Sequence, residues 1–209
     1  VLRKRQKFSE ALEQAKVLMA RDPDNPLFQS HFAIESMQAG DYETALEYFE
    51  RVLEQIPNDP ATLVSRGHAL KTYGRTEDAI ASYQAATEIA PGQGDAWYGL
   101  ANLKTYTFGD DELSRLEAQF AAPDIDHMSR IHIAFALGKA QEDRGNHDAA
   151  FTAYAQGNAL KHQTVRYTTE QMHAEFDAQK AICTADLFEA QGGKGCAAPD
   201  PIFILGLPR

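Results

Sequence analysis

The sequence is poor in cysteine and has no long hydrophobic run. Of its 209 residues two are cysteines, Cys183 and Cys196, which lie thirteen residues apart without a Cys-x-x-Cys pair or a histidine-rich context. A disulfide framework or a zinc motif needs more cysteines at closer spacing, so we expect reduced thiols in a cytoplasmic protein. The longest apolar run, residues 202–207, is far shorter than the roughly 20 residues that span a bilayer. We therefore expect no membrane partner.

Basic residues are scarce relative to acidic ones. The chain has 20 lysines and arginines against 30 aspartates and glutamates, which gives a net charge of −10 and a pI of about 5.1. A nucleic-acid-binding protein would present a basic face, so we expect no nucleic acid as a partner. The one basic cluster, Arg3, Lys4 and Arg5 with Lys7, is interpreted as the solvated end of a helix.

What the sequence does contain is an internal repeat. Segments that begin at Gly40, Gly74 and Gly145 align without gaps, and the first two start 34 residues apart. Other landmarks follow the same phase. They are a small residue in each first helix (Ala33, Gly67, Ala101, Gly138), an alanine in each second helix (Ala11, Ala45, Ala79, Ala150), an aromatic residue four positions later (Phe49, Tyr83, Tyr154) and a terminating proline (Pro23, Pro57, Pro91).

Each landmark has a packing reason. Small residues on facing helices let the helix axes approach, and the aromatic ring one turn later fills the space between neighbouring helix pairs. Proline ends the second helix, and the glycine accepts the left-handed conformation that closes the first helix. The pattern and its 34-residue period resemble the tetratricopeptide repeat. This resemblance implies an all-α fold, a right-handed α-solenoid of helix-turn-helix repeats over residues 1–165.

The phase predicts the repeat boundaries. They are a partial repeat at about residues 1–25, repeats at residues 26–59 and 60–93, a divergent repeat at residues 94–130 and a last repeat at residues 131–164. The partial repeat has its second helix, from about Phe8 to Arg21, and almost nothing of its first. Either the natural chain starts earlier or an apolar face is uncovered there.

The region after the repeats has a different composition. We expect one or more additional helices over residues 166–190, opened by a capping box at Thr168, and a flexible linker over residues 191–200. In the divergent repeat, Asp110 and Asp111 are typical of a helix start and predict a helix there.

The last nine residues, 201–209, differ from everything before them. Ile202–Leu205 is apolar on both faces, as in a central strand of a parallel sheet, so we expect a stub of one β-strand. The following turn contains Gly206, Pro208 and Arg209. A strand, a glycine turn and a cation resemble the opening of the 5′-phosphosulfate loop of sulfotransferases. The divergent and last repeats also resemble those of a bacterial family in which tetratricopeptide repeats precede a sulfotransferase domain.

That resemblance implies a parent protein that transfers sulfonate from 3′-phosphoadenosine 5′-phosphosulfate to a hydroxyl, with Gly206, Pro208 and Arg209 in cofactor-binding positions. Residues 1–209 are then expected to hold no cofactor and to be inactive, and no catalytic residue is assigned. The alternative is a free-standing adaptor that binds a peptide or protein. Ser-Gly followed by Thr or Ser after Arg209 would favour the enzyme, and a stop codon would favour the adaptor.

A second candidate site is the concave groove lined by the first helices. Among the residues that the phase places on this groove, six are candidates for partner binding: His68, Lys71, Tyr98, Asn102, Tyr106 and Lys139. The cations and the amide suit an acidic peptide or an anionic acceptor, and the tyrosines offer amphipathic contact area. An ordinary solvated groove is the alternative, and assembly as a homodimer stays open. His127 and His132, near Asp124 and Asp126, match no metal-ligand spacing, so we expect no metal.

Overall fold

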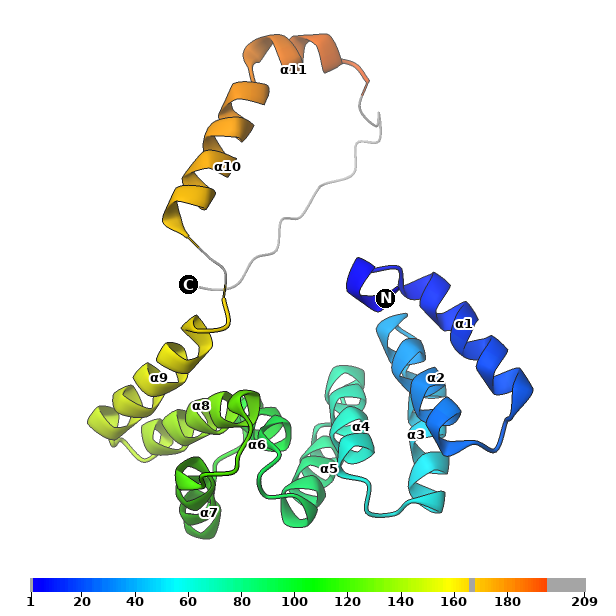
Figure 1. Cartoon of the computed structure of the whole chain (residues 1–209), viewed down its shortest axis with the longest axis vertical. Helices are drawn as coiled ribbons and strands as arrows, with labels where there is room; N and C mark the ends of the chain where they lie inside the picture. Colours follow the sequence, from blue (N-terminus) through cyan, green and yellow to red (C-terminus); the bar gives the residue numbers. More distant parts are fainter. Residues whose placement is uncertain (1, 166–167, 195–209) are drawn as a thin grey trace. The chain divides into compact units, whose positions relative to one another are not determined.

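The described part of the chain is built from helices. The computed structural model describes residues 2–165 and 168–194, and the chain divides into two units, residues 1–164 and 165–209. Every regular element in the described ranges is helical, as the repeat pattern predicts (Figure 1). The first unit contains a 3-10 turn η1 (Arg3–Arg5), α1 (Phe8–Arg21), α2 (Pro26–Gln38), α3 (Tyr42–Gln55), α4 (Pro60–Tyr73), α5 (Thr76–Ile89), α6 (Gly94–Ala101), α7 (Asp110–Ala121), α8 (His127–Asp143) and α9 (His147–His162); the second contains α10 (Thr169–Ile182) and α11 (Ala185–Gln191).

Three helix pairs, α2–α3, α4–α5 and α8–α9, share one turn. Gly40, Gly74 and Gly145 close their first helices with φ angles of 90°, 91° and 76°, as the sequence predicts. Only glycine adopts this region at little cost, so these turns depend on the residue type. In Figure 1 the pairs follow one another along an arc, and α2 and α4 lie on the inner side of this arc relative to α1 and α5.

The core consists of the predicted small and aromatic residues. Ala33, Ala45 and Phe49 of one repeat and Ala79 and Tyr83 of the next are fully buried. Close contact of alanine and glycine with large rings gives dense packing without wide hydrophobic helix faces. This explains how helices of modest apolar content stack into a solenoid.

The divergent repeat has a short first helix. α6 ends at Ala101, and the chain then folds back so that Leu103 and Phe108 are buried beside Trp97. The Trp97 and Phe108 rings are 6.2 Å apart, and the Trp97 indole donates a hydrogen bond to the Pro91 carbonyl oxygen at 2.8 Å. α7 begins at Asp110, as predicted from its acidic start.

The first helix of the last pair begins earlier than the repeat phase predicts. The sequence places this start near Ile131, but α8 begins at His127, so that prediction is wrong. The reason is local, because the Asp126 carboxylate accepts hydrogen bonds from the amides of Met128 and Ser129 and caps a longer helix. α9 ends at His162.

The second unit contains the two additional helices. Thr168 Oγ1 accepts a hydrogen bond from the Gln171 amide at 3.1 Å, which is one of the two hydrogen bonds of the predicted capping box; the Gln171 side chain instead donates to Glu175 at 3.5 Å. α11 extends to Gln191, the first residue of the predicted linker, and neither helix contains a buried residue. The predicted strand at Ile202–Leu205 lies outside the described residues. In the described ranges, no helix has the length and apolar character needed to cross a membrane.

Candidate functional site

The first helices α4, α6 and α8 place a cluster of polar and aromatic side chains side by side. α6 contacts both α4 and α8 along the solenoid. On α4, His68 Nδ1 lies 2.7 Å from the Tyr83 hydroxyl, and the two rings meet edge to face with centroids 5.4 Å apart. Tyr83 is fully buried, whereas His68 is exposed. The fixed tyrosine therefore holds the histidine at the groove surface.

A second part of the cluster joins α6 to α8. His132 Nδ1 lies 2.7 Å from the Asp95 carboxylate, and its ring stacks on Tyr98 with centroids 4.9 Å apart and an interplanar angle of 13°. Phe135 meets the Tyr98 ring edge to face at 6.3 Å. Tyr98 remains 36% exposed, so this aromatic surface is accessible to a ligand.

The environment sets the charge of this cluster. Burial lowers the pKa of His68, nearby Lys71 lowers it further, and Asp95 opposes the shift. Burial also raises the pKa of Tyr83, so its hydroxyl stays protonated. The hydrogen bond with His132 holds the pKa of Asp95 below its usual range. Near neutral pH the cluster therefore combines an uncharged His68 with an ionised Asp95.

The six predicted groove residues differ in whether they are free to contact a ligand. Lys71 and Asn102 are exposed at the ends of α4 and α6. Tyr106 and Lys139 are bound to other parts of the protein. Lys139 Nζ donates to the Tyr106 carbonyl oxygen at 3.0 Å and to Asp143 at 2.5 Å. The lysine ammonium is thus already neutralised.

Tyr106 has internal partners of its own. Its hydroxyl donates to Glu112 at 2.5 Å and accepts from Gln84 Nε2 at 3.0 Å, and burial raises its pKa. Of the six residues, His68 and Tyr98 occupy the centre of the cluster, with Lys71 and Asn102 at its edge.

Asp95 and His132 were missed by the sequence reasoning as a pair. They are the second residues of segments that begin at Gly94 and Ile131, and these segments start 37 residues apart instead of 34. The signal was their equal offset from the predicted starts of two successive repeats, Gly94 and Ile131. The irregular period concealed it.

The other titratable residues considered in the sequence make local contacts outside the cluster. Asp126 caps α8, and its hydrogen bonds to Ser129 lower its pKa. His127 Nε2 lies 3.1 Å from the Leu160 carbonyl oxygen. Among the described residues, no group of three or more histidines, cysteines, aspartates and glutamates is suited to hold a metal ion. Gly206, Pro208 and Arg209 lie outside the described residues.

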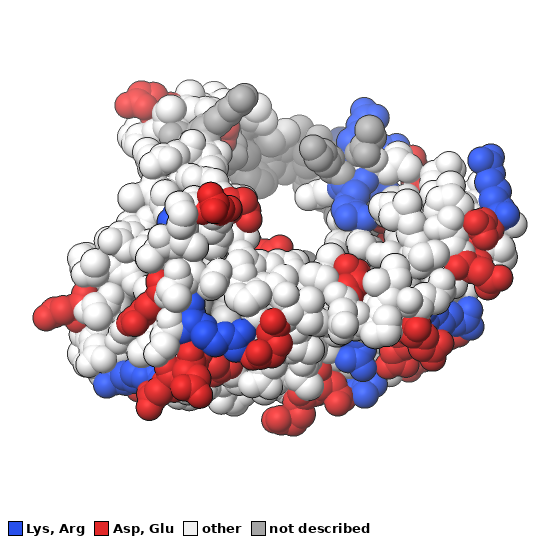
Figure 2. Space-filling view, turned by 60° about the horizontal axis from the view of Figure 1, so that its bottom comes forward, with Lys and Arg blue, Asp and Glu red and all other residues white. Residues whose placement is uncertain are grey.

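The molecular face shown in Figure 2 has mixed charge. Figure 2 shows acidic and basic side chains intermixed along the lower edge of the view. Several pairs join different helices, such as Arg66 with Glu50 at 3.3 Å and Arg144 with Asp110 at 3.0 Å. This charge pattern suits polar recognition of a partner at an interface rim.

The stacked helix pairs define a helical-repeat solenoid, a class of protein in which each unit packs against its neighbours. Comparison with known proteins identifies the repeat. A family model for the tetratricopeptide repeat matches residues 1–60, and another matches residues 60–93. The chain contains tetratricopeptide repeats.

Curated relatives extend the similarity beyond the two matched segments. An uncharacterized protein of Aquifex aeolicus (strain VF5) is 24% identical over 165 residues, which are 79% of this chain and 21% of that protein. The RNA polymerase-associated protein CTR9 of Caenorhabditis elegans is 28% identical over 133 residues, 61% of this chain and 12% of that protein. The chain therefore spans a small part of the length of these relatives.

Solved structures support the fold. The crystal structure of MamA has a TM-score of 0.57 at 18% identity and covers 79% of this chain and 95% of that chain. A putative kinesin light chain from Podosopora anserina, with TPR-like repeats, has a TM-score of 0.56 at 18% identity, with coverage of 79% and 92%. At this identity the similarity concerns the fold.

Proposed function

We propose that the chain is a protein-interaction scaffold that binds a peptide segment of a partner along α4, α6 and α8. The observation that carries the proposal is the exposed Tyr98 ring, held between His132 and Phe135. Such a ring gives a partner side chain apolar contact area at low entropic cost. Around it, Asp95, His68 and Lys71 supply polar contacts of both signs.

The charge of this surface refines the expected ligand. Lys139 is paired with Asp143, and Asp95 adds an ionised carboxylate at the centre of the cluster. Compared with the sequence-based expectation of an acidic peptide, the proposed ligand has an apolar side chain for Tyr98 and polar groups of mixed charge around it. The same surface on two copies would also allow a homodimer.

Site-specific photo-crosslinking tests this proposal. A benzoylphenylalanine residue at position 98 is expected to give one discrete adduct with a partner protein in cells that express the natural chain, and His132→Ala is expected to reduce it. The control position is Phe151 on α9, which is 76% exposed. Equal crosslinking from positions 98 and 151 would contradict the proposal.

A second proposal makes the scaffold the N-terminal part of a 3′-phosphoadenosine 5′-phosphosulfate-dependent sulfotransferase in the cytoplasm. It is favoured by the sequence of residues 201–209, in which an apolar run precedes Gly206, Pro208 and Arg209. In this case the groove presents the acceptor, or mediates assembly, for a catalytic domain that carries the rest of the phosphosulfate loop. The gene sequence after codon 209 decides the question, because Ser-Gly followed by Thr or Ser supports the enzyme and a stop codon excludes it.

A further inference from the structure

A pocket of about 360 Å³ lies between α7, α8 and α9. Leu137 of α8 and Ala149 and Ala153 of α9 give it an apolar surface. Glu117 of α7 and Asp148 of α9 add two carboxylates, and the remaining lining residues are polar and uncharged. Earlier grooves of the same solenoid indicate which side chain fits such a pocket, because each of them contains an arginine.

The groove between α3 and α5 is closed by an arginine of the first helix α4. Arg66 donates to Ser82 Oγ of α5 at 2.7 Å and to the Glu50 carboxylate of α3 at 3.3 Å. Its side chain is 22% exposed, so the guanidinium group lies within the groove. One arginine therefore joins two successive second helices, through a carboxylate of the earlier helix and a neutral oxygen of the later one.

The next groove, between α5 and α7, also contains an arginine. Arg115 of α7 donates to the Glu88 carboxylate and, at 2.7 Å, to the Thr87 carbonyl oxygen, which both belong to α5. Its guanidinium carbon lies 5.1 Å from the centroid of the Trp97 ring. Two successive grooves thus hold one guanidinium group each, against a carboxylate of the earlier second helix.

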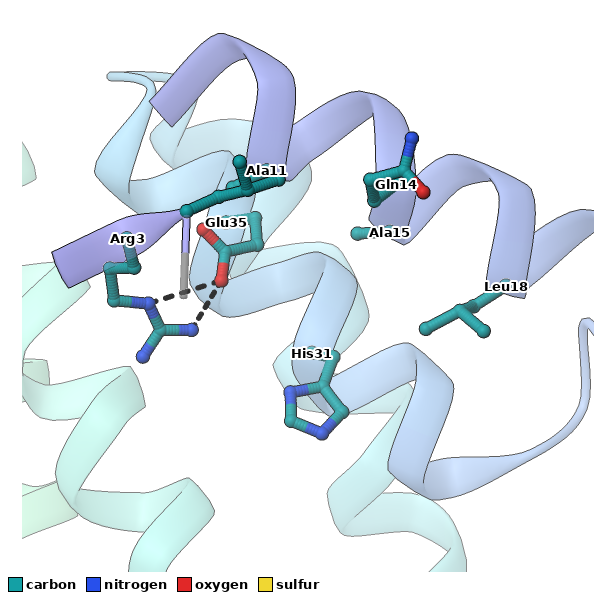
Figure 3. Close-up of a pocket in the computed structure, with 8 residues that line it drawn as sticks. Arg3, Ala11, Gln14, Ala15, Leu18, His31 and Glu35 are labelled. Atoms are coloured by element: carbon teal, nitrogen blue, oxygen red, sulfur yellow. Dashed lines mark hydrogen bonds and ion pairs between the residues drawn. The ribbon is translucent and has the colours of Figure 1, made fainter. Parts of the chain in front are cut away.

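A pocket at α1 shows the same pairing (Figure 3). There Arg3 of η1 donates to Glu35 Oε1 of α2 through both Nε, at 3.1 Å, and Nη2. This pocket of about 470 Å³ is also lined by Ala15 of α1, which stands where Phe49 and Tyr83 occur in the following repeats. Arginine–glutamate pairs therefore connect different helical elements at these three places in the first unit.

The groove between α7 and α9 has the carboxylate of the earlier helix, Glu117, without the arginine. By the repeat phase, Leu137 stands where α4 has Arg66. Likewise, Ala153 stands where α5 has Ser82. None of the eight lining residues is a lysine or an arginine. Leucine and alanine thus replace the long cation and its hydroxyl acceptor, and the pocket lies where the bridge would be.

The described part of the chain does not neutralise the carboxylates of this pocket. Glu117 accepts a hydrogen bond from the Gln141 side-chain amide at 3.3 Å, which is a neutral donor. The arginines of α8, Arg130 and Arg144, bind the two ends of α7 instead. Neither Glu117 nor Asp148 forms an ion pair with a described residue. Two negative charges on different helices therefore line a pocket that contains no cation of its own.

We propose that this pocket binds an arginine side chain of a partner protein. The aliphatic stem of that arginine lies on Leu137 and Ala149, and its guanidinium group donates to Glu117 of α7 and Asp148 of α9. Arginine suits the pocket better than lysine, because its planar fork of donors reaches acceptors on two helices at once, as Arg66 does. The chain's net charge of −10 favours approach of a basic segment. No lining residue belongs to the aromatic cluster described above, so this site is independent of the proposed function.

A capped pentapeptide, Ala-Ala-Arg-Ala-Ala, provides the probe, and the same peptide with citrulline in place of arginine is its matched control. Citrulline has the shape of arginine without the charge. Free L-arginine is the third ligand, because it lacks the flanking residues that a partner protein supplies. Methyl signals of Leu137, Ala149 and Ala153 in NMR spectra of the 209-residue chain report on the pocket directly.

We expect saturable shifts of these methyl signals with the arginine peptide, and binding of the citrulline peptide that is about fivefold weaker. Free L-arginine should also bind more weakly, because the flanking residues of the peptide contact the exposed Thr152 and Gln156. Glu117→Gln is expected to weaken binding of the arginine peptide about twofold to fivefold, whereas Glu54→Gln, the same change on α3, leaves it unchanged. Ala149→Leu fills the pocket from an exposed position and is expected to abolish binding, and circular dichroism checks that this variant is folded.

Four outcomes would overturn the proposal. The first is no saturable shift with the arginine peptide, and the second is equal binding of the citrulline peptide, because the pocket would then not recognise the charge. The third is undiminished binding to folded Ala149→Leu, which would place the bound peptide elsewhere. The fourth is binding of free L-arginine as tight as that of the peptide, because the pocket would then take the free amino acid. Crosslinking at position 98 does not depend on position 117 or 149, so failure of this proposal is distinguishable from failure of the proposed function.

Discussion

The Tyr83 ring of α5 lies directly against Gly67 of α4: a Cβ atom at position 67 would be 2.5 Å from Tyr83 Cε1. Gly99 of α6 meets the same ring, where a Cβ atom would be 2.6 Å away. One side chain thus joins the first helices of two successive repeats, and its hydroxyl also contacts His68 of the candidate groove. Groove geometry and core packing therefore depend on the same residue.

In Gly67→Ala the added methyl group overlaps the buried Tyr83 ring, which costs about 1–3 kcal/mol. The gain of about 1 kcal/mol that alanine brings to a helix interior offsets part of this cost, so we expect the free energy of unfolding to fall by up to about 2 kcal/mol. Urea denaturation measures the change. Gly157→Ala is the comparison, since its Cβ would be 3.2 Å from Ala134 Cβ and the loss should be smaller. Stabilisation by Gly67→Ala would contradict the packing argument.

The stability of the first unit is expected to fall as the pH decreases through the range in which His68 titrates. The folded state lowers the pKa of His68 from 6.5, so protonation favours the unfolded chain. The contribution of neutral His68 to the free energy of unfolding is complete above about pH 6.5 and is lost as the pH falls toward the folded-state pKa. Urea denaturation between about pH 7.5 and pH 5.5 measures how the free energy of unfolding changes with pH. This change should be smaller for His68→Asn than for His162→Asn, a substitution at an exposed histidine. Equal slopes would remove His68 as the cause.

Substitutions of the two partners of the Arg3–Glu35 pair are expected to have different effects on the free energy of unfolding. Arg3→Ala leaves both carboxylate oxygens of buried Glu35 without this donor, which costs about 1–3 kcal/mol. Glu35→Leu, the residue found at position 103, removes the buried Oε2, which has no hydrogen-bond partner among the described residues, and is expected to be neutral or stabilising. Thermal unfolding of both variants measures the difference. Destabilisation by Glu35→Leu that matches Arg3→Ala would show that Oε2 is satisfied in solution.

Amide hydrogen exchange is expected to be faster in α10 than in α4. α10 has 14 residues and none is buried, whereas Leu70 and Ala69 of α4 are fully buried. Helices of this length have marginal stability without tertiary packing, so α10 amides should exchange much faster than those of α4. Protection of α10 equal to that of α4 would show that another surface covers it.

The sequence predicted the helix pairs because their determinants are local and periodic. Gly40, Gly74 and Gly145 close turns within a few residues, and Ala45 and Ala79 recur at the repeat period, so one pattern locates both. The start of α8 was missed because the phase of the repeat was extended to residue 131, whereas the capping side chain of Asp126 determines where that helix begins.

The candidate sites depend on contacts between repeats, which the pattern does not encode. The phase placed His68, Tyr98 and Lys139 on the first helices, but it did not predict that Lys139 pairs with Asp143. The Asp95–His132 pair was concealed by the irregular spacing of the divergent repeat. Likewise, the unpaired oxygen of Glu35 follows from the three-dimensional position of Arg3.

The alanine at position 15 also has a mechanical consequence. In a solenoid each helix pair is held only by its neighbours, so the weakest junction yields first under load. Phe49 and Tyr83 connect adjacent pairs through buried rings, whereas α1 is attached through alanines beside a pocket. A stretching force applied to residues 1–164 is therefore expected to separate α1 from α2 at a lower load than it separates the helix pairs that Phe49 and Tyr83 connect.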